Sequence, residues 1–133
     1  MNVKIDKELL DCLTRQAKAS VRMRMNLDLR NSAADSSQRM LNAIEPGSEV
    51  PVHRHRSTSE TFVVLRGRVV EEFYNSTGEI EACHEVAAGG DVCALNIPAG
   101  VWHTLRSLES GTVNLGMKDG AYEPIGPEDI LGV

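Results

Sequence analysis

The sequence predicts one mainly β domain, an antiparallel sandwich or small barrel, with a single helix near its N-terminus. Short runs of apolar or alternating residues follow one another along the chain, and most of them end at a turn segment. This pattern is typical of eight or so strands. The length of 133 residues, with 41% hydrophobic and 25% charged residues, is typical of one globular domain.

The N-terminal elements differ in their hydrophobic period. Apolar residues recur at helical spacing from Ile5 to Ala17, which predicts an amphipathic helix over residues 5–19. Apolar and polar residues alternate over residues 21–30, which predicts a half-buried strand, and residues 31–37 form a polar loop. The chain therefore divides into a helix-and-strand extension (1–37), a barrel (38–118) and a C-terminal tail (119–133) that packs on the barrel or on a partner subunit.

The charge pattern and the cysteines exclude several classes of protein. The net charge is −5 and basic residues form no long run, so we expect no nucleic-acid partner. No apolar stretch approaches the roughly 20 residues of a membrane helix, and the first residues lack the apolar segment of a signal peptide. We therefore expect a cytoplasmic protein without a membrane partner. Three cysteines without a CxxC pair do not indicate a disulfide framework.

Three of the four histidines predict a metal site. His53 and His55 lie two residues apart on a predicted strand, so their imidazoles share one face. Glu60 begins the next run after a short connection, and His103 directly follows a turn. Three imidazoles and a carboxylate would hold one divalent transition metal ion, such as Zn, Ni, Fe, Mn or Cu. The fourth histidine, His84, falls outside this set.

The spacing of these residues resembles the two sequence motifs of the cupins. The first motif is met at every position, by Gly47, His53, His55, Glu60 and Gly67. The core of the second motif is met by Pro98, Gly100 and His103. Two positions depart from the second motif, because Gly90 precedes Pro98 by seven residues rather than five and Ser107 replaces an asparagine. The resemblance implies an RmlC-like jelly-roll barrel (a double-stranded β-helix) and His53, His55, Glu60 and His103 as metal ligands.

Three longer stretches narrow this resemblance. Residues 20–27, 38–67 and 117–124 are similar to the small bacterial metal-binding cupins of WbuC type. This likeness implies a cytoplasmic metalloprotein of a group that is associated with surface-polysaccharide gene clusters.

Alternation also suggests residues that line a substrate pocket. Phe62 and Val64 share the parity of Glu60, and Leu105 shares that of His103, so all three face the interior, where plain core packing is the alternative. Gln38 and Asn42 share one face of a strand, and they are either pocket amides or solvated groups.

Arg22 and Arg24 allow two interpretations. On an inward face their guanidinium groups would bind a carboxylate or a phosphate near the metal. Their alternation with Met23, Met25 and Leu27 favours the other interpretation, in which the apolar residues are buried and the arginines are exposed or paired across a dimer interface.

Two classes of function follow from these features. The first is a metalloenzyme, such as an isomerase, epimerase or oxygenase, that acts on a small polar molecule such as a sugar derivative or an oxo acid. The second is a non-catalytic module that binds or senses a small molecule through its metal. We also expect a homodimer, because the apolar stripe of the N-terminal helix must be buried.

Overall fold

A computed structural model describes residues 3–132 of the chain. In this range it contains α1 (Lys7–Ala19), β1 (Arg24–Asp28), β2 (Gln38–Ile44), β3 (Glu60–Arg66), β4 (Arg68–Tyr74), β5 (Ile80–Ala87), β6 (Ala94–Ile97), β7 (Trp102–Ser107), β8 (Val113–Lys118) and a short 3-10 helix, η1 (Pro127–Asp129). None of the helices described in this range has the length and apolarity that crossing a membrane requires.

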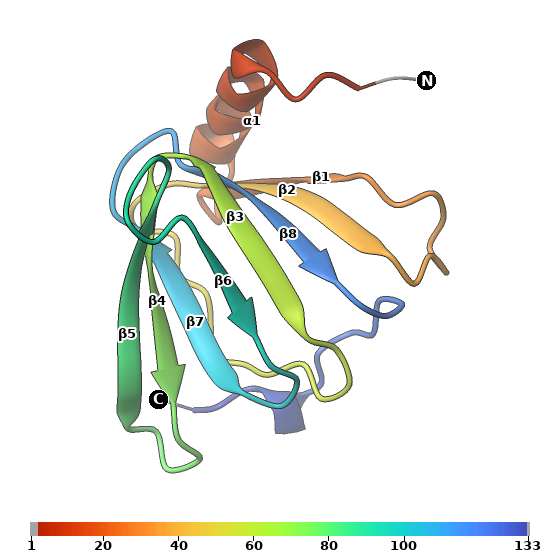
Figure 1. The fold of residues 1–133 in the computed structure, drawn as a ribbon, viewed down its shortest axis with the longest axis vertical. Helices are drawn as coiled ribbons and strands as arrows, with labels where there is room; N and C mark the ends of the chain where they lie inside the picture. Colours follow the sequence, from red (N-terminus) through yellow and green to blue (C-terminus); the bar gives the residue numbers. More distant parts are fainter. Residues whose placement is uncertain (1–2, 133) are drawn as a thin grey trace.

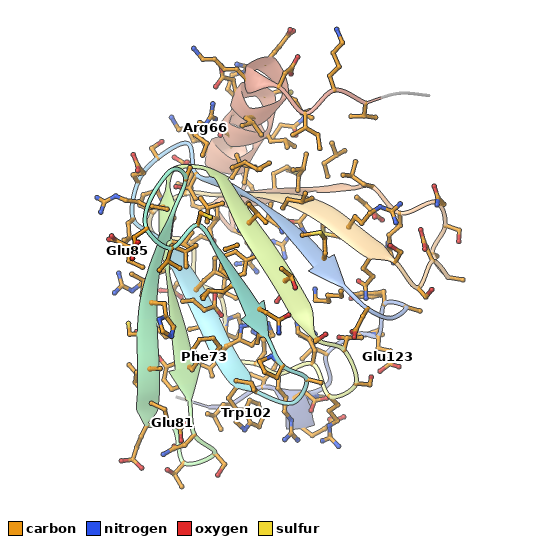
Figure 2. All side chains as sticks on the ribbon, in the orientation of Figure 1. Arg66, Phe73, Glu81, Glu85, Trp102 and Glu123 are labelled. Atoms are coloured by element: carbon orange, nitrogen blue, oxygen red, sulfur yellow. The ribbon has the colours of Figure 1, made fainter. Side chains whose placement is uncertain are left out.

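Two antiparallel sheets form the body of the molecule (Figure 1). One sheet has the strand order β1-β2-β8-β3-β6 and the other has the order β5-β4-β7. Figure 2 shows Phe73 between the sheets and Glu85 on the outer side of β5. The apolar core between the sheets consists of Ile44, Phe62, Val64, Val69, Val86 and Ile97. The predicted mainly β, jelly-roll fold with an N-terminal helix is confirmed, although the two sheets do not close into a continuous barrel.

α1 lies against the side of the five-stranded sheet that faces away from the three-stranded sheet (Figure 1), and a second apolar core lies between them. Leu10, Leu13 and Ala17 of the helix pack there against Leu41, Ala43 and Val113. Met25 and Leu27 of β1 join the same cluster. Since side chains alternate along a strand, the even-numbered residues of β1 and β2 face the three-stranded sheet instead.

The ends of the first two elements differ from the prediction for local reasons. The helix begins at Lys7 rather than at residue 5, because the Asp6 carboxylate accepts a hydrogen bond from the Leu9 N–H at 3.0 Å and caps the first turn. Strand β1 begins at Arg24 rather than at residue 21. Met23 has a left-handed φ of 57°, which interrupts the extended backbone.

The prediction that His53 and His55 lie on a strand is wrong. Residues 49–59 form a connection, in which His53 makes isolated bridges with His103 and with Ile130. The end of the chain contributes to this arrangement, since the Leu131 N–H donates to the Val52 carbonyl at 2.8 Å. The C-terminal tail thus packs directly beside the first histidine of the pair.

Candidate metal centre

His53, His55 and His103 lie on two segments that are hydrogen-bonded to each other. The backbones of His53 and His103 exchange two hydrogen bonds, at 3.0 and 2.8 Å. The Gly100 N–H donates to the His55 carbonyl at 2.7 Å, and Gly100 has a φ of 83°, which glycine adopts readily. The turn before β7 therefore holds the connection with His53 and His55 against His103.

The three imidazoles meet at one place. One ring nitrogen from each lies within 4.8 Å of the other two. The ring centroids are 4.5 Å apart for His53 and His103, and 5.1 Å apart for His53 and His55. His53 Nδ1 is 2.8 Å from the Pro51 carbonyl oxygen, which can only accept a hydrogen bond. His53 therefore carries its proton on Nδ1, and the Nε2 lone pair is free to bind an ion.

His103 has the most restricted environment of the three. Its side chain is 2% exposed, and its Nδ1 lies 2.6 Å from Oε1 of Glu71, which is fully buried on β4. Among the described residues neither His103 Nε2 nor Glu71 Oε2 has a hydrogen-bond partner. A buried polar atom without a partner is costly, and a bound cation would remove that cost. The donor set thus fits a metal ion of the kind that imidazoles prefer.

Burial controls the charge of these groups. It is the largest cause that lowers the pKa of each of the three histidines, and it brings the pKa of His55 to about 3. The imidazoles are therefore neutral near pH 7, as metal ligands must be. Burial, followed by the negative charges of Glu60 and Glu72, raises the pKa of Glu71 to about 9. A cation bound to His103 would oppose this rise.

Glu60 lies beside the three histidines rather than within the same group. It is the first residue of β3, and its carboxylate is not among the atoms that lie within 4.8 Å of one another. Its Oε2 is 3.7 Å from Nζ of Lys118, its cross-strand partner on β8. The negative charge of Glu60 nevertheless acts on His53 and His103, because it partly offsets the lowering of their pKa by burial. The role of Glu60 as a fourth ligand stays a prediction.

The histidines line a pocket of about 450 Å³ between the two sheets, which we call the metal pocket. The even-numbered residues of β1, β2 and β8 face it from the five-stranded sheet, and they combine charged and amide side chains with the apolar Met40 and Ile44. Asn42 Nδ2 donates to Asn114 Oδ1 at 3.0 Å, and Gln38 Nε2 donates to the Gly120 carbonyl at 2.7 Å. Of the residues proposed from the sequence, the structure places Gln38, Asn42, Phe62, Leu105, Arg24 and Glu60 in this lining.

Two residues proposed from the sequence lie outside the lining. Val64 is 4% exposed and packs in the core between the sheets, two residues beyond Phe62 along β3. Arg22 is exposed and precedes β1, because the left-handed Met23 interrupts the alternation that would have aligned it with Arg24. Arg24 itself faces the metal pocket, although the sequence pattern favoured an exposed position.

Sequence reasoning missed Glu71, Asn114 and Lys118. A signal for Glu71 was present, since it lies between Val69 and Phe73 on the apolar parity of its strand, where a charged residue needs a reason. Asn114 and Lys118 share a polar parity on β8, but alternation alone does not show which face of a sheet is inside. Lys118 meets Glu60 only through the pairing of β3 with β8, which no local pattern indicates.

Comparisons with known proteins describe the family and the fold. Residues 5–86 match the family model described as Domain of unknown function (DUF6016), a range that includes His53, His55 and Glu60 and ends before His103. A comparison with curated proteins finds no match.

Several solved structures share the fold. The capsular polysaccharide assembling protein CapF from Staphylococcus aureus is 21% identical with a TM-score of 0.59, over 75% of this chain and 32% of that one. Oxalate oxidase in complex with glycolate is 15% identical with a TM-score of 0.65, over 81% and 56%. KdgF from Halomonas sp. is 14% identical with a TM-score of 0.59, over 75% and 82%.

These three neighbours are cupins, and at these identities the likeness shows the fold alone. The chain spans about a third of CapF and about half of oxalate oxidase.

Proposed function

Since the chain belongs to the family of domains of unknown function DUF6016, we propose its function from its own site: a metal-dependent cupin enzyme for a small polar substrate. In this proposal His53, His55, His103 and Glu60 hold one divalent transition metal ion. The observation that carries it is the buried Nε2 of His103, which has no partner among the described residues and lies beside two further imidazoles. Three neutral imidazoles and an adjacent carboxylate suit Zn, Ni, Fe, Mn or Cu.

The residues around the site have separate tasks in this proposal. A bound divalent ion would supply Lewis-acid chemistry at a substrate oxygen. Glu71 orients the ring of His103 through Nδ1, and the Pro51 carbonyl does the same for His53. Glu60, paired with Lys118 at the pocket wall, is the carboxylate that would accept or return a substrate proton when it is not bound to the ion.

The size and lining of the metal pocket support a small polar substrate, such as a sugar derivative or an oxo acid. A volume of about 450 Å³ lies within the usual range for small-molecule sites. The resemblance to WbuC-type cupins supports a link with surface polysaccharides, and one structural neighbour is described as a capsular polysaccharide assembling protein. The isomerase, epimerase or oxygenase class, the homodimer and the cytoplasmic location stay predictions.

Metal content tests the proposed centre. Elemental analysis of protein purified without a metal-affinity tag should find close to one divalent ion per chain. A His53→Ala/His55→Ala double variant should lose that ion, and so should His103→Ala. His84→Ala is the matched control, because His84 is an exposed histidine on β5 outside the group. Unchanged occupancy in the double variant would contradict the site.

Turnover separates the enzyme from the binding module. Metal-loaded protein should convert at least one member of a panel of nucleotide sugars and small oxo acids, and the double variant should not. Saturable binding of a panel member without conversion would instead favour a non-catalytic binding or sensing module.

A further inference from the structure

The basic side chains of the metal pocket differ in whether an acidic partner accompanies them. Lys118 is paired with Glu60 at 3.7 Å, and Arg30 makes a close ion pair with Asp28 at 2.8 Å. Arg24 also lines the metal pocket, but no carboxylate of the described chain lies within 4.0 Å of its guanidinium. Burial, and secondarily the charge of Arg22, lowers the pKa of Arg24. A half-buried cation is therefore left without a counter-charge.

The backbone around Arg24 is fixed by the turn that follows β2. The Glu45 N–H donates to the Met23 carbonyl at 2.9 Å, and the Ser48 hydroxyl donates to the Arg22 carbonyl at 2.7 Å. Met23, between these two contacts, has a φ of 57°, which a methionine rarely adopts. A conformation of this kind persists only where its surroundings enforce it.

The guanidinium of Arg24 is held but has donors to spare. Its Nη1 donates to the Glu49 carbonyl at 2.8 Å and is 3.4 Å from the Ser48 hydroxyl. An arginine side chain has five N–H donors in a planar fork, and a fork of this kind matches a carboxylate or a phosphate. The structure gives Nε and Nη2 no hydrogen-bond partner among the described residues. These nitrogens are available to a ligand.

A row of amides connects Arg24 with the rest of the pocket wall. Asn26 on β1, Asn42 on β2 and Asn114 on β8 stand opposite one another in register. All three line the metal pocket, and Asn26 lies two residues after Arg24 on the same strand. Amides donate and accept hydrogen bonds, so this row suits the polar middle of a ligand whose charged end meets Arg24.

We propose that the metal pocket takes an anionic ligand, and that Arg24 binds its carboxylate or phosphate group while the opposite end of the ligand meets the histidine centre. This inference rests on the proposed function and adds to it the charge of the substrate and a residue that selects for it. Neutral sugars would then be poor ligands, because they leave Arg24 without its anion, and a simple monocarboxylate would bind less tightly because it has one anion for either Arg24 or the histidine centre but not for both.

Matched ligands test this assignment by calorimetry on zinc-loaded protein. Succinate and butyrate have the same number of carbons but two and one carboxylates, and 3-phosphonopropionate replaces one carboxylate of succinate with a phosphonate. Wild-type protein should bind succinate or 3-phosphonopropionate at least tenfold more tightly than butyrate, and the better of the two identifies the anion. In Arg24→Gln this preference should disappear, and in Arg24→Lys it should be reduced.

Arg22→Gln is the matched control, because it removes the same charge two residues away from an exposed side chain outside the pocket. It should keep the preference of the wild type. The zinc content of every variant is measured in parallel. Zinc-free wild-type protein would contradict the proposed metal centre, whereas a zinc-loaded Arg24→Gln variant that keeps the preference would overturn the role of Arg24. A wild type that binds butyrate as tightly as both dianions would also overturn it.

Discussion

The two faces of the five-stranded sheet are built from the same strands and do different work. The face beneath α1 is apolar and closely packed, with Leu41 and Val113 fully buried. The face toward the three-stranded sheet carries Arg24 and the amides of Asn42 and Asn114. Neighbouring residues of one strand therefore belong to a packed core and to a binding wall.

This difference separates stability from ligand binding. Burial of an aliphatic side chain under α1 stabilises the fold, whereas a buried charged or amide group must find a partner or cost stability. The face beneath α1 buries aliphatic side chains in this way and so stabilises the fold. The opposite face exposes polar groups to a pocket, and these groups are useful only when a ligand or an ion completes their contacts. Substitutions beneath α1 should accordingly lower the free energy of unfolding, whereas substitutions on the pocket face should mainly weaken ligand binding.

The largest effect on stability should come from the face beneath α1. Leu41→Ala removes a fully buried side chain from the contact with α1 and leaves a cavity, so the free energy of unfolding should fall by about 2–5 kcal/mol. Its metal content should stay that of the wild type. Asn42→Ala, one residue along and on the other face, should cost about 1 kcal/mol or less. Urea unfolding measures both, and equal losses would contradict the division of labour.

The second effect is the loss of stability that burial of the Glu71 carboxyl causes, and it depends on pH. The pKa of Glu71 is raised from 4.5 to about 9 in the folded chain. Above pH 4.5 the unfolded chain ionises this group and the folded chain does not, so Glu71 lowers stability progressively up to about pH 9. The expected slope from one group is about 1.4 kcal/mol per pH unit.

Glu71→Gln removes this titration and tests it directly. In chelator-treated protein, the stability of the variant relative to wild type should increase between pH 5 and pH 8. The lowered pKa values of the three histidines act in the opposite sense, because stability is lost as pH falls below 6.5, but both proteins share that loss. Urea midpoints at several pH values measure the difference, and a difference that does not change with pH would contradict the assignment.

The smallest effect on stability should come from Gly116, where the pocket face has no side chain. A Cβ at this position would lie 3.3 Å from Asn42 Nδ2 and 3.5 Å from Glu60 Oε2. Gly116→Ala should therefore change the free energy of unfolding by no more than about 1 kcal/mol, yet weaken ligand binding by narrowing the pocket. Calorimetry with succinate checks this, and undiminished affinity would show that the ligand does not use this space.

Sequence patterns predicted the elements better than their environment. The alternation in β1 correctly separated Met25 and Leu27 from Arg24, but it did not reveal which of the two faces lies inside the molecule. That choice depends on α1, whose stripe of Leu10, Leu13 and Ala17 covers the outer face of the sheet. The apolar parity of β1 therefore faces the helix, and the arginine faces the pocket.

The sequence predicted the three histidines of the centre but not the residue that contacts His103. Motif spacing identified His53, His55 and His103, because each motif fixes how a turn and its neighbouring strand place a ligand. Glu71 was not found, since its contact with His103 arises from the pairing of β4 with β7 over 32 residues of chain. The segment with His53 and His55 looked like a strand, yet bridges from His103 and Ile130 hold it instead.

The contact of the tail with His53 also orders events in time. During synthesis on the ribosome, the backbone around His53 cannot form its bridge with His103 until residue 103 has emerged. It cannot form its bridge with Ile130 until that residue has emerged. Asp129, which pairs with Arg54 and Arg56 on either side of His55, arrives equally late. Nascent chains that stop short of this point lack the contacts that hold two of the three histidines in place. The centre is thus completed only after Asp129 and Ile130 have been made.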